Sequence, residues 1–336
     1  MTGKLDRIML AHGSGGRLSH ELVGEIVRAL PDPVLEKLGD AAELELVSGR
    51  LAFTTDTYTV TPPVFPGGDI GKLAVCGTVN DLAAAGARPR FLSLALVLEE
   101  GLELKLLRRI LVSIAAATKE AGVRVVTGDT KVVERGGADR IFINTSGVGE
   151  LGEGTQLGPE RIRPGDKVLI NGGIGEHGAA VLAQRQNLGL GGLASDCAPL
   201  WGLVEAVLSS GCDVRFMRDA TRGGLATVLN EAAEGRDFGI SLLESAVPVS
   251  EPVRAFCELL GYDPLYIANE GKMVIVAEPE GAARALAAMR AHPLGGGAAV
   301  IGEVVERPTG RVYLKTAVAG RRVLDMLTGD QFPRIC

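Results

Sequence analysis

Five aspartates stand in settings that suit a metal–nucleotide site. Each lies beside a small residue or a hydroxyl, at a predicted strand end or in a loop: Asp40, Asp56, Asp81, Asp129 and Asp219. Carboxylate oxygens of this kind suit Mg²⁺, which proteins often bind through a few carboxylates together with substrate phosphates. A single such aspartate is more often a helix cap or turn former. Five in similar settings favour a metal–nucleotide site.

A glycine-rich segment near the start of the chain could wrap phosphates with its backbone N–H groups. It precedes a predicted helix over residues 18–30. The residues concerned are His12, Gly13, Ser14, Gly15 and Gly16. A Walker A sequence is absent, and a flexible N-terminal loop is the alternative interpretation.

A second glycine motif supports a rival hypothesis, a dinucleotide-binding enzyme. Gly173, Gly175 and Gly178 match the spacing GxGxxG between a predicted strand and helix, with Asp196 about 20 residues further on. The motif opens the second half of the chain, however, and no clear strand precedes Asp196. His177, inside the motif, is as consistent with a structural side chain as with a catalyst.

Two ionisable residues are candidates for proton transfer. Lys131 directly follows the run TGDT, and Glu270 lies in the run ANEGK. A lysine beside a phosphate-binding loop can bind phosphate, or transfer a proton if burial lowers its pKa. A surface salt bridge is the alternative for either residue.

The last residue, Cys336, carries a thiol at the end of a non-periodic segment that contains Gly and Pro. From Gly329 to Cys336, an extended chain spans at most about 26–29 Å. A thiol on such an arm can enter a buried site and also meet a partner outside, and its thiolate is a nucleophile. A spare thiol without a function is the alternative.

The elements that must position these residues alternate between strands and helices. In the first half we expect strands over 51–56, 123–126 and 141–144, and a helix over 102–121 that Gly122 ends. In the second half we expect strands over 167–170 and 273–277, helices over 179–186 and 225–234, and a short helix over 321–327. Clustered Gly and Pro place the domain boundary near 150–165. The predicted units are residues 1–155, 156–320 and a mobile tail, 321–336.

Composition narrows the class of protein. The chain has 336 residues, of which 46% are hydrophobic, and a net charge of −6, which does not favour nucleic acid or an anionic membrane surface. We find no apolar run of about 18 residues and no signal-peptide pattern. The five cysteines show no CxxC or Cys/His metal spacing. An odd count does not suggest a disulfide framework, so we expect a cytoplasmic protein.

Taken together, these motifs resemble the HypE family of carbamoyl dehydratases. The resemblance spans essentially the whole chain, and FPGGDIG and the final PRIC are its most specific runs. Its motifs occupy residues 12–16, 55–57, 65–71, 77–82, 127–132, 175–178, 219–224, 269–271 and 333–336. Glu176 stands where many members have Asp, an exchange that keeps the carboxylate.

The resemblance implies a fold and a reaction. The fold is shared with aminoimidazole ribonucleotide synthetase: an N-terminal α/β domain, a C-terminal α+β domain, and a homodimer whose N-terminal sheets complete a barrel. The partner HypF would load a carbamoyl group onto Cys336, and ATP would phosphorylate its oxygen. Loss of phosphate and a proton would leave a thiocyanate. The cyano group would then pass to iron on a HypC–HypD complex during [NiFe]-hydrogenase maturation.

The resemblance also implies residue roles. Mg²⁺ would be held by the five aspartates, and Glu270 and Lys131 would be the candidate bases. ATP would be bound by His12, Gly13, Ser14, Gly15, Gly16, Asn80, Thr130, Gly223 and Gly224. Two other hypotheses stay open: a synthetase of the same fold acting on a free small molecule, which would not need Cys336, and a tail-presenting interaction protein, which would not need ATP turnover.

Overall fold

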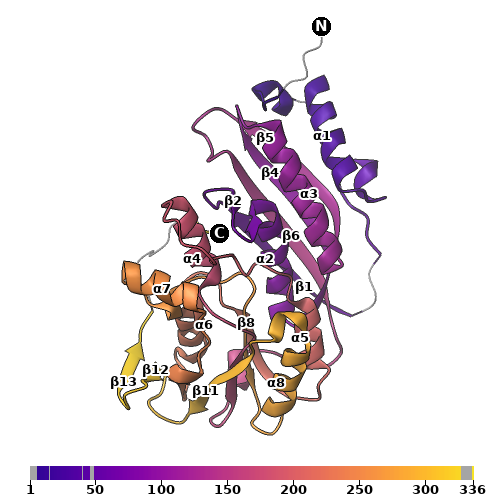
Figure 1. Cartoon of the computed structure of the whole chain (residues 1–336). Helices are drawn as coiled ribbons and strands as arrows, with labels where there is room; N and C mark the ends of the chain where they lie inside the picture. The colour runs from indigo at the N-terminus through magenta and orange to yellow at the C-terminus, as the bar shows by residue number, and fades with distance from the viewer. Residues whose placement is uncertain (1–5, 15, 40, 46–48, 327–334) are drawn as a thin grey trace.

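The computed structural model describes residues 6–14, 16–39, 41–45, 49–326 and 335–336. Two predicted site residues, Gly15 and Asp40, lie outside these ranges. The chain forms two α/β units, each built on its own sheet, that meet at helix α2 and strand β8 (Figure 1).

The first unit has a four-stranded sheet in the order β1-β6-β4-β5. Its strands are β1 (Arg50–Tyr58), β4 (Ala87–Glu99), β5 (Arg124–Val133) and β6 (Ile141–Leu151). β4 and β5 are parallel, and the other two pairs are antiparallel. A small hairpin, β2 (Val64–Phe65) and β3 (Gly68–Asp69), leads into α2 (Ile70–Ala84). The carboxylate of Asp69 caps α2 by accepting hydrogen bonds from the N–H groups of Gly71 and Lys72.

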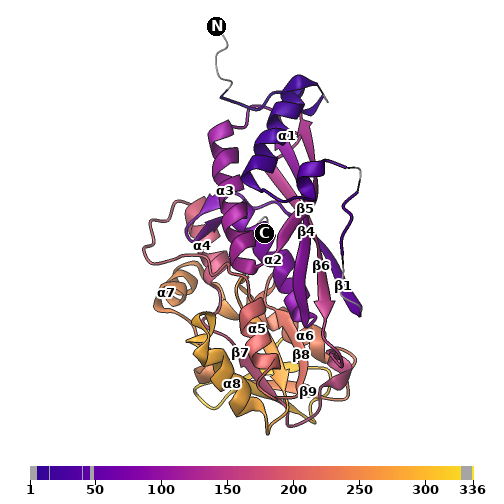
Figure 2. The ribbon, with the colours of Figure 1, turned by 90° about the vertical axis from the view of Figure 1, so that its right-hand side faces the viewer.

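Helices α2 and α3 (Leu104–Ala121) lie on one face of this sheet (Figure 2). Strand alternation therefore gives β1 one covered and one open face. Tyr58 faces α2 and is 1% exposed, whereas Phe53 on the opposite face is 72% exposed. The open face also carries a polar ladder, in which Ser146 and Asn144 of β6 bond to the hydroxyls of Thr55 and Thr57.

The N-terminal segment packs at β5. It comprises the 3₁₀ turn η1 (Leu10–Gly13), helix α1 (Arg17–Ala29) and the 3₁₀ turn η2 (Leu35–Lys37). A Cβ at Gly13 would lie 2.9 Å from the Cβ of Val132, so the close approach of η1 to β5 requires glycine there.

The second unit has a seven-stranded sheet in the order β13-β12-β9-β11-β7-β10-β8. Its strands are β7 (Lys167–Ile170), β8 (Val214–Asp219), β9 (Gly239–Leu243), β10 (Met273–Ala277), β11 (Ala299–Val305), β12 (Val312–Lys315) and β13 (Arg321–Leu324). Its helices are α4 (Glu176–Arg185), α5 (Trp201–Leu208), α6 (Gly224–Ala233), α7 (Glu251–Leu260) and α8 (Ala282–Ala291). Four 3₁₀ turns complete it: η3 (Pro159–Arg161), η4 (Glu244–Ala246), η5 (Pro264–Tyr266) and η6 (Pro293–Gly295).

Most predicted elements are present, with shifted ends. The strands over 167–170 and 273–277 match β7 and β10, and Gly122 ends α3 in the left-handed conformation, with φ of 67°. β5 runs on to Val133, so Asp129 lies within a strand and not after one.

The short helix predicted over 321–327 is wrong, because Arg321–Leu324 forms β13, which pairs antiparallel with β12. Leu324 is 1% exposed, and its burial in the hairpin stabilises the strand. The predicted tail, residues 321–336, thus begins with this strand, and its bounds stay a prediction.

The GxGxxG motif does not form a dinucleotide site. β7, which precedes it, is antiparallel to both of its neighbours, β10 and β11, so the parallel β-α-β unit that such a site needs is absent there. Gly175 instead caps α4 with a φ of 83°.

The connection between the two sheets runs from Leu151 to Lys167. The domain boundary at 155/156 falls within it and stays a prediction. In the described part of the chain, no helix is long and apolar enough to cross a membrane.

Candidate active site

Three of the predicted metal-binding aspartates converge where the two units meet. Asp56 of β1, Asp81 of α2 and Asp219 at the end of β8 line one cavity of about 590 Å³, together with Arg218 and Arg222. Asp81 lies on the same helix that packs against β8. The cavity therefore receives its acids from three elements that are distant in sequence.

The electrostatics of this acid cluster are those of crowded carboxylates. Burial raises the pKa of Asp81, a hydrogen bond of 2.9 Å from the Thr54 hydroxyl lowers it, and the charge of Asp56 raises it further. Burial, and then the charge of Asp81, raise the pKa of Asp219 to about 7. Arg218 opposes both shifts. A bound cation would relieve this repulsion.

The acids are not drawn together into a preformed metal cage. Among the residues that the structure describes, no three His, Cys, Asp or Glu side chains form a group that could hold a metal ion. The donor set nevertheless fits Mg²⁺, which commonly takes one or two carboxylates and fills its other positions with water and phosphate oxygens.

The start of α6 lies at the same cavity. Thr221 and Arg222 line it, and the helix begins directly after them. Gly223 and Gly224 have φ values of 74° and 61°, and a Cβ at Gly224 would lie 2.6 Å from the carbonyl oxygen of Leu265. Glycine is required for this turn, and the N-terminus of the helix suits a phosphate.

Glu270 is a buried acid between the two units. It is 3% exposed, and its Oε1 has no hydrogen-bond partner among the described residues. Burial raises its pKa well above the usual value, and the nearby Cys197 and Asp219 add to the shift. An unpartnered buried carboxyl of raised pKa is the group expected of a proton acceptor.

The backbone of Glu270 is fixed on both sides. Its N–H donates to Asp196 Oδ1 at 3.0 Å, and its carbonyl accepts from Asn80 Nδ2 at 3.1 Å. Asn80, predicted to bind ATP, is 1% exposed and also bonds the backbone of Ala198 and Leu200. Its side-chain atoms are thus engaged in holding the Glu270 segment.

The other predicted residues gather in a separate cluster around α1. His12, Gly13, Asp129, Thr130 and Lys131 line a cavity of about 290 Å³. Lys131 Nζ lies 3.0 Å from Asp129 Oδ2, and this pairing lowers the pKa of Asp129.

The remaining polar groups of the glycine-rich segment serve local structure. His12 Nδ1 accepts from the N–H of Met9 at 3.0 Å. The hydroxyl of Ser14 donates to Ala11 at 2.9 Å, and Gly16 precedes α1 as its N-cap residue.

Sheet register separates the two clusters within one chain. Asp129 pairs with Ala95, Ala95 with Asn144, and Asn144 with Thr57. Asp129 is therefore about 14 Å from β1, three strand spacings away, and it points to the open face with Thr57. Asp56, one residue earlier in β1, points to the α2 face. One chain does not bring Asp129 and Lys131 to the acid cluster.

The end of the chain is docked against the first unit. Ile335 is 3% exposed, and its carbonyl accepts a hydrogen bond of 2.6 Å from His177 Nε2. A main-chain carboxylate oxygen of Cys336 accepts from both the N–H and the hydroxyl of Thr59, at 3.2 and 3.3 Å. Thr59 is three residues beyond Asp56, about 10 Å along the strand direction. Thr59 was not among the predicted site residues. His177 was considered only because it lies within the glycine motif.

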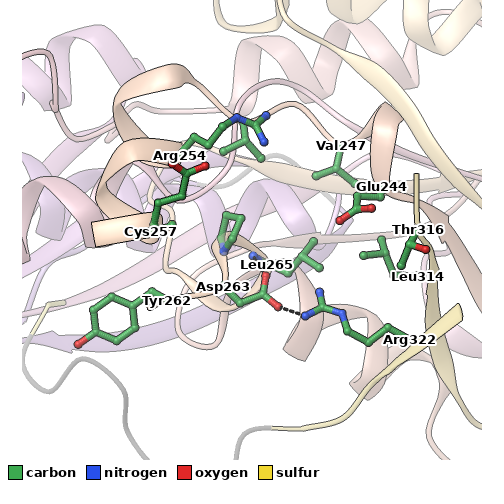
Figure 3. A pocket seen from close by; sticks show the side chains of 13 residues that line it. Glu244, Val247, Arg254, Cys257, Tyr262, Asp263, Leu265, Leu314, Thr316 and Arg322 are labelled. Carbon is green, nitrogen blue, oxygen red and sulfur yellow. Dashed lines mark hydrogen bonds and ion pairs between the residues drawn. The ribbon is translucent and has the colours of Figure 1, made fainter. Parts of the chain in front are cut away.

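A further cavity of about 490 Å³ lies wholly in the second unit, beside α7, η5 and β12. Arg322 and Asp263 form an ion pair of 2.6 Å at its edge (Figure 3). None of the predicted catalytic or binding residues lines it, so it is separate from the candidate site.

Comparisons with known proteins agree with the two-unit division. Residues 38–151 match the family model "AIR synthase related protein, N-terminal domain", and residues 163–315 match "AIR synthase related protein, C-terminal domain". The chain is 50% identical over 335 residues to carbamoyl dehydratase HypE of Rhodobacter capsulatus, covering 98% of each.

Solved structures of HypE proteins are also similar to this chain. A crystal structure of the hydrogenase maturation protein HypE in complex with ATP matches with a TM-score of 0.94 and 49% identity, over 98% of this chain and 99% of that one. A HypE–HypF complex matches with a TM-score of 0.80 and 45% identity, over 93% of this chain and 100% of that one. The predicted fold, an α/β and an α+β domain of the aminoimidazole ribonucleotide synthetase type, is confirmed.

Proposed function

The chain belongs to the HypE family of carbamoyl dehydratases, and we propose from this premise that it uses ATP to dehydrate a carbamoyl group carried on the thiol of Cys336. The observation that carries the proposal is the docked end of the chain. Cys336 lies at the end of β1, and the same strand contributes Asp56 to the acid cluster. The end of the chain and the acid cluster thus both contact the segment of β1 and Thr59, about 10 Å apart along it.

ATP activates the carbamoyl oxygen as a leaving group. That oxygen attacks the γ-phosphorus, the bond to ADP breaks, and the carbamoyl group becomes an O-phosphorylated imidate as it loses one N–H proton. The N-terminus of α6, with its left-handed Gly223 and Gly224, would bind phosphate oxygens. Arg218 and Arg222 line the same cavity and would add positive charge.

Elimination then forms the product. The carbon–oxygen bond to phosphate breaks as the second N–H proton leaves, which gives a thiocyanate on Cys336, inorganic phosphate and ADP. Glu270 is the proposed acceptor of a proton, because its Oε1 is buried and no described residue bonds to it. The raised pKa makes this carboxylate a stronger base than an exposed one.

Mg²⁺ fits the acid cluster by the chemistry of its donors. Asp56, Asp81 and Asp219 would hold it, since burial and their mutual repulsion raise the pKa of Asp81 and Asp219. Bound there, it would neutralise charge on the transferred phosphoryl group.

Binding of Mg²⁺ with ATP should strengthen as pH rises through about 7. Protons compete with the cation for the Asp219 carboxylate, whose pKa is about 7, so affinity should rise by up to about tenfold per pH unit below that value and level off above it. Calorimetric titration near pH 6, 7 and 8 measures the effect. Comparison with Asp219→Asn removes the contribution of the nucleotide's own protonation, and equal pH slopes for the two proteins would contradict the assignment.

We further propose a homodimer formed by the open faces of two first-unit sheets. Phe53 and Leu51 are 72% and 46% exposed there, more than an isolated chain would be expected to leave uncovered. Asp129 and Lys131 point toward the same face. A second copy packed on it would cover these residues together with Phe53 and Leu51.

The variant Phe53→Glu should weaken the dimer by on the order of a hundredfold, because the carboxylate would be buried without a partner. Sedimentation velocity measures association, and ATP-dependent turnover should fall in parallel. The matched control is Val112→Glu, at a position 67% exposed on α3. A Phe53→Glu protein that stays dimeric would place the interface elsewhere.

We propose HypF as the carbamoyl donor and a HypC–HypD complex as the acceptor of the cyano group. A solved HypE–HypF complex of the same fold supports the first partner. A reducing cytoplasm is the proposed compartment, since the sulfur of Cys336 must stay reduced to accept a carbamoyl group.

Mass spectrometry of the peptide that ends at Cys336 tests the proposed function. After incubation with HypF, carbamoyl phosphate and ATP, we expect a carbamoyl adduct that loses one water only when ATP is present. A synthetase acting on a free small molecule would leave this peptide unmodified. A tail-presenting interaction protein would keep the adduct without consuming ATP.

A further inference from the structure

The last two residues of the chain are held by groups from two different domains. His177, on α4 of the second unit, donates to the carbonyl of Ile335, and Thr59, just beyond β1, donates to a main-chain carboxylate oxygen of Cys336. We propose that His177 and Thr59 form a dock that positions the Cys336 thiol in the active site. This inference rests on the proposed function and deepens it, because it assigns positioning residues for the reacting thiol.

The hydrogen bonds around His177 define its protonation. A carbonyl oxygen can only accept, so the Nε2 that contacts Ile335 carries the proton. Burial at 0% exposure lowers the pKa of His177, which keeps it neutral and leaves Nδ1 as an acceptor. The hydroxyl of Ser195, 2.8 Å away, can donate to that nitrogen, and its oxygen accepts from the N–H of Cys197 at 3.1 Å. Each donor and acceptor in this series of hydrogen bonds therefore has a defined partner.

The imidazole is also fixed by packing. The ring of Phe65 meets it edge to face, with ring centroids 5.4 Å apart. The imidazole therefore presents Nε2–H to the tail in one direction, as a positioning residue must.

The loop that orients His177 also holds Glu270. Asp196, the neighbour of Ser195, accepts from the N–H groups of Glu270 and Gly271 at 3.0 and 3.1 Å, and Lys272 pairs with the same carboxylate at 3.0 Å. The dock and the proposed base are therefore mounted on one short segment, which fixes the docked tail relative to the base.

Two consecutive main-chain oxygens are fixed, that of the Ile335 carbonyl and one of the Cys336 carboxylate, and this sets the register of the tail. The side chain of Ile335 is buried in the core shared with Cys197, which anchors the chain one residue before the thiol. Because the groups on both sides of the Cys336 N–Cα bond are held, rotation about the backbone at the reacting residue is restricted. The residue that follows the His177-bound carbonyl is Cys336. Its side chain is therefore the one presented beside Thr59.

Alkylation of Cys336 by iodoacetamide tests the dock without requiring the enzyme's activity. Docking should protect this thiol, and the other four cysteines are internal controls because they are buried, at 0–8% exposure. His177→Ala and Thr59→Val should each raise the alkylation rate of Cys336 roughly three- to tenfold, the effect of one lost hydrogen bond. His177→Gln keeps an N–H donor at a similar reach and should restore much of the protection. His20→Ala, an exposed histidine of α1, is the matched control.

A purely structural role for His177 would expose the buried cysteines together with Cys336. Site-resolved mass spectrometry distinguishes that result from selective exposure of the tail. Ile335→Ser removes the anchor from the tail side without changing His177 or Thr59, and it too should increase alkylation of Cys336. The dock is overturned if Cys336 of the wild-type protein reacts as fast as a free peptide of the last eight residues, or if none of these variants changes its rate selectively. Either result would leave the carbamoylation assay, and thus the proposed function, unaffected.

Discussion

The variant Cys336→Ser is expected to accept no carbamoyl group from HypF and to form no detectable product. A serine hydroxyl stays protonated near neutral pH, whereas a free thiol has a small thiolate fraction that is strongly nucleophilic. We expect loading to fall by at least about a thousandfold, which is the largest effect of any single change proposed for this chain. The mass of the peptide that ends at residue 336 measures it.

The matched control is Cys212→Ser. Cys212 is 8% exposed in the core of the second unit, away from the acid cluster, and burial raises its pKa to about 11. This variant should be loaded at the wild-type rate. A carbamoyl adduct on Cys76, Cys197, Cys212 or Cys257 of the wild-type protein would instead remove Cys336 from the reaction.

Helices and strands that depend on the pattern of nearby residues were predicted well from the sequence. β7 and β10 were predicted from short apolar runs, and both strands are buried along most of their length. The end of α3 was predicted from Gly122, whose left-handed conformation other residues rarely adopt. These features depend on neighbours within a few residues.

Features that depend on strand order could not be predicted in the same way. Asp56 and Asp129 have similar local contexts, yet they lie on opposite faces and opposite edges of one sheet. Their separation follows from the order β1-β6-β4-β5 and from the parity of each residue in its strand. Neither the strand order nor the parity can be read from the residues on either side of an aspartate.

The tail illustrates the same limit. We expected a short helix over 321–327, but pairing with β12 makes residues 321–324 a strand. The groups that hold its last residues lie 158 and 277 positions away in sequence. The reach of the tail could be predicted from the length of the segment. The place where it docks could not, because it depends on groups that the packing of two domains brings together.

Burial is what distinguishes Glu270 from Lys131, which the sequence placed side by side as candidate bases. Lys131 is exposed and paired with Asp129, the surface salt bridge given as the alternative for it. Glu270 is buried and unpartnered at Oε1 among the described residues, with a raised pKa. Of these two candidates, Glu270 has the environment of a base.

The variant Glu270→Gln should therefore separate the two halves of the reaction. Glutamine keeps the size of the side chain, and the backbone bonds to Asp196 and Asn80 are available to either residue. Loading by HypF should be unchanged, because it needs only the thiol. Dehydration should slow by about 10²–10⁴-fold, the usual contribution of a general base.

Mass spectrometry of the tail peptide after addition of ATP gives both rates in one experiment. In Glu270→Gln the carbamoyl adduct should accumulate and persist, whereas in the wild type it should lose water. Glu205→Gln, at an exposed position of α5, is the matched control and should behave as the wild type. Unchanged loss of water in Glu270→Gln would remove Glu270 from the mechanism and direct attention to Lys131 of a second copy. Loss of loading would show instead that the substitution disturbs the tail dock, since Asp196 connects Glu270 to the segment that orients His177.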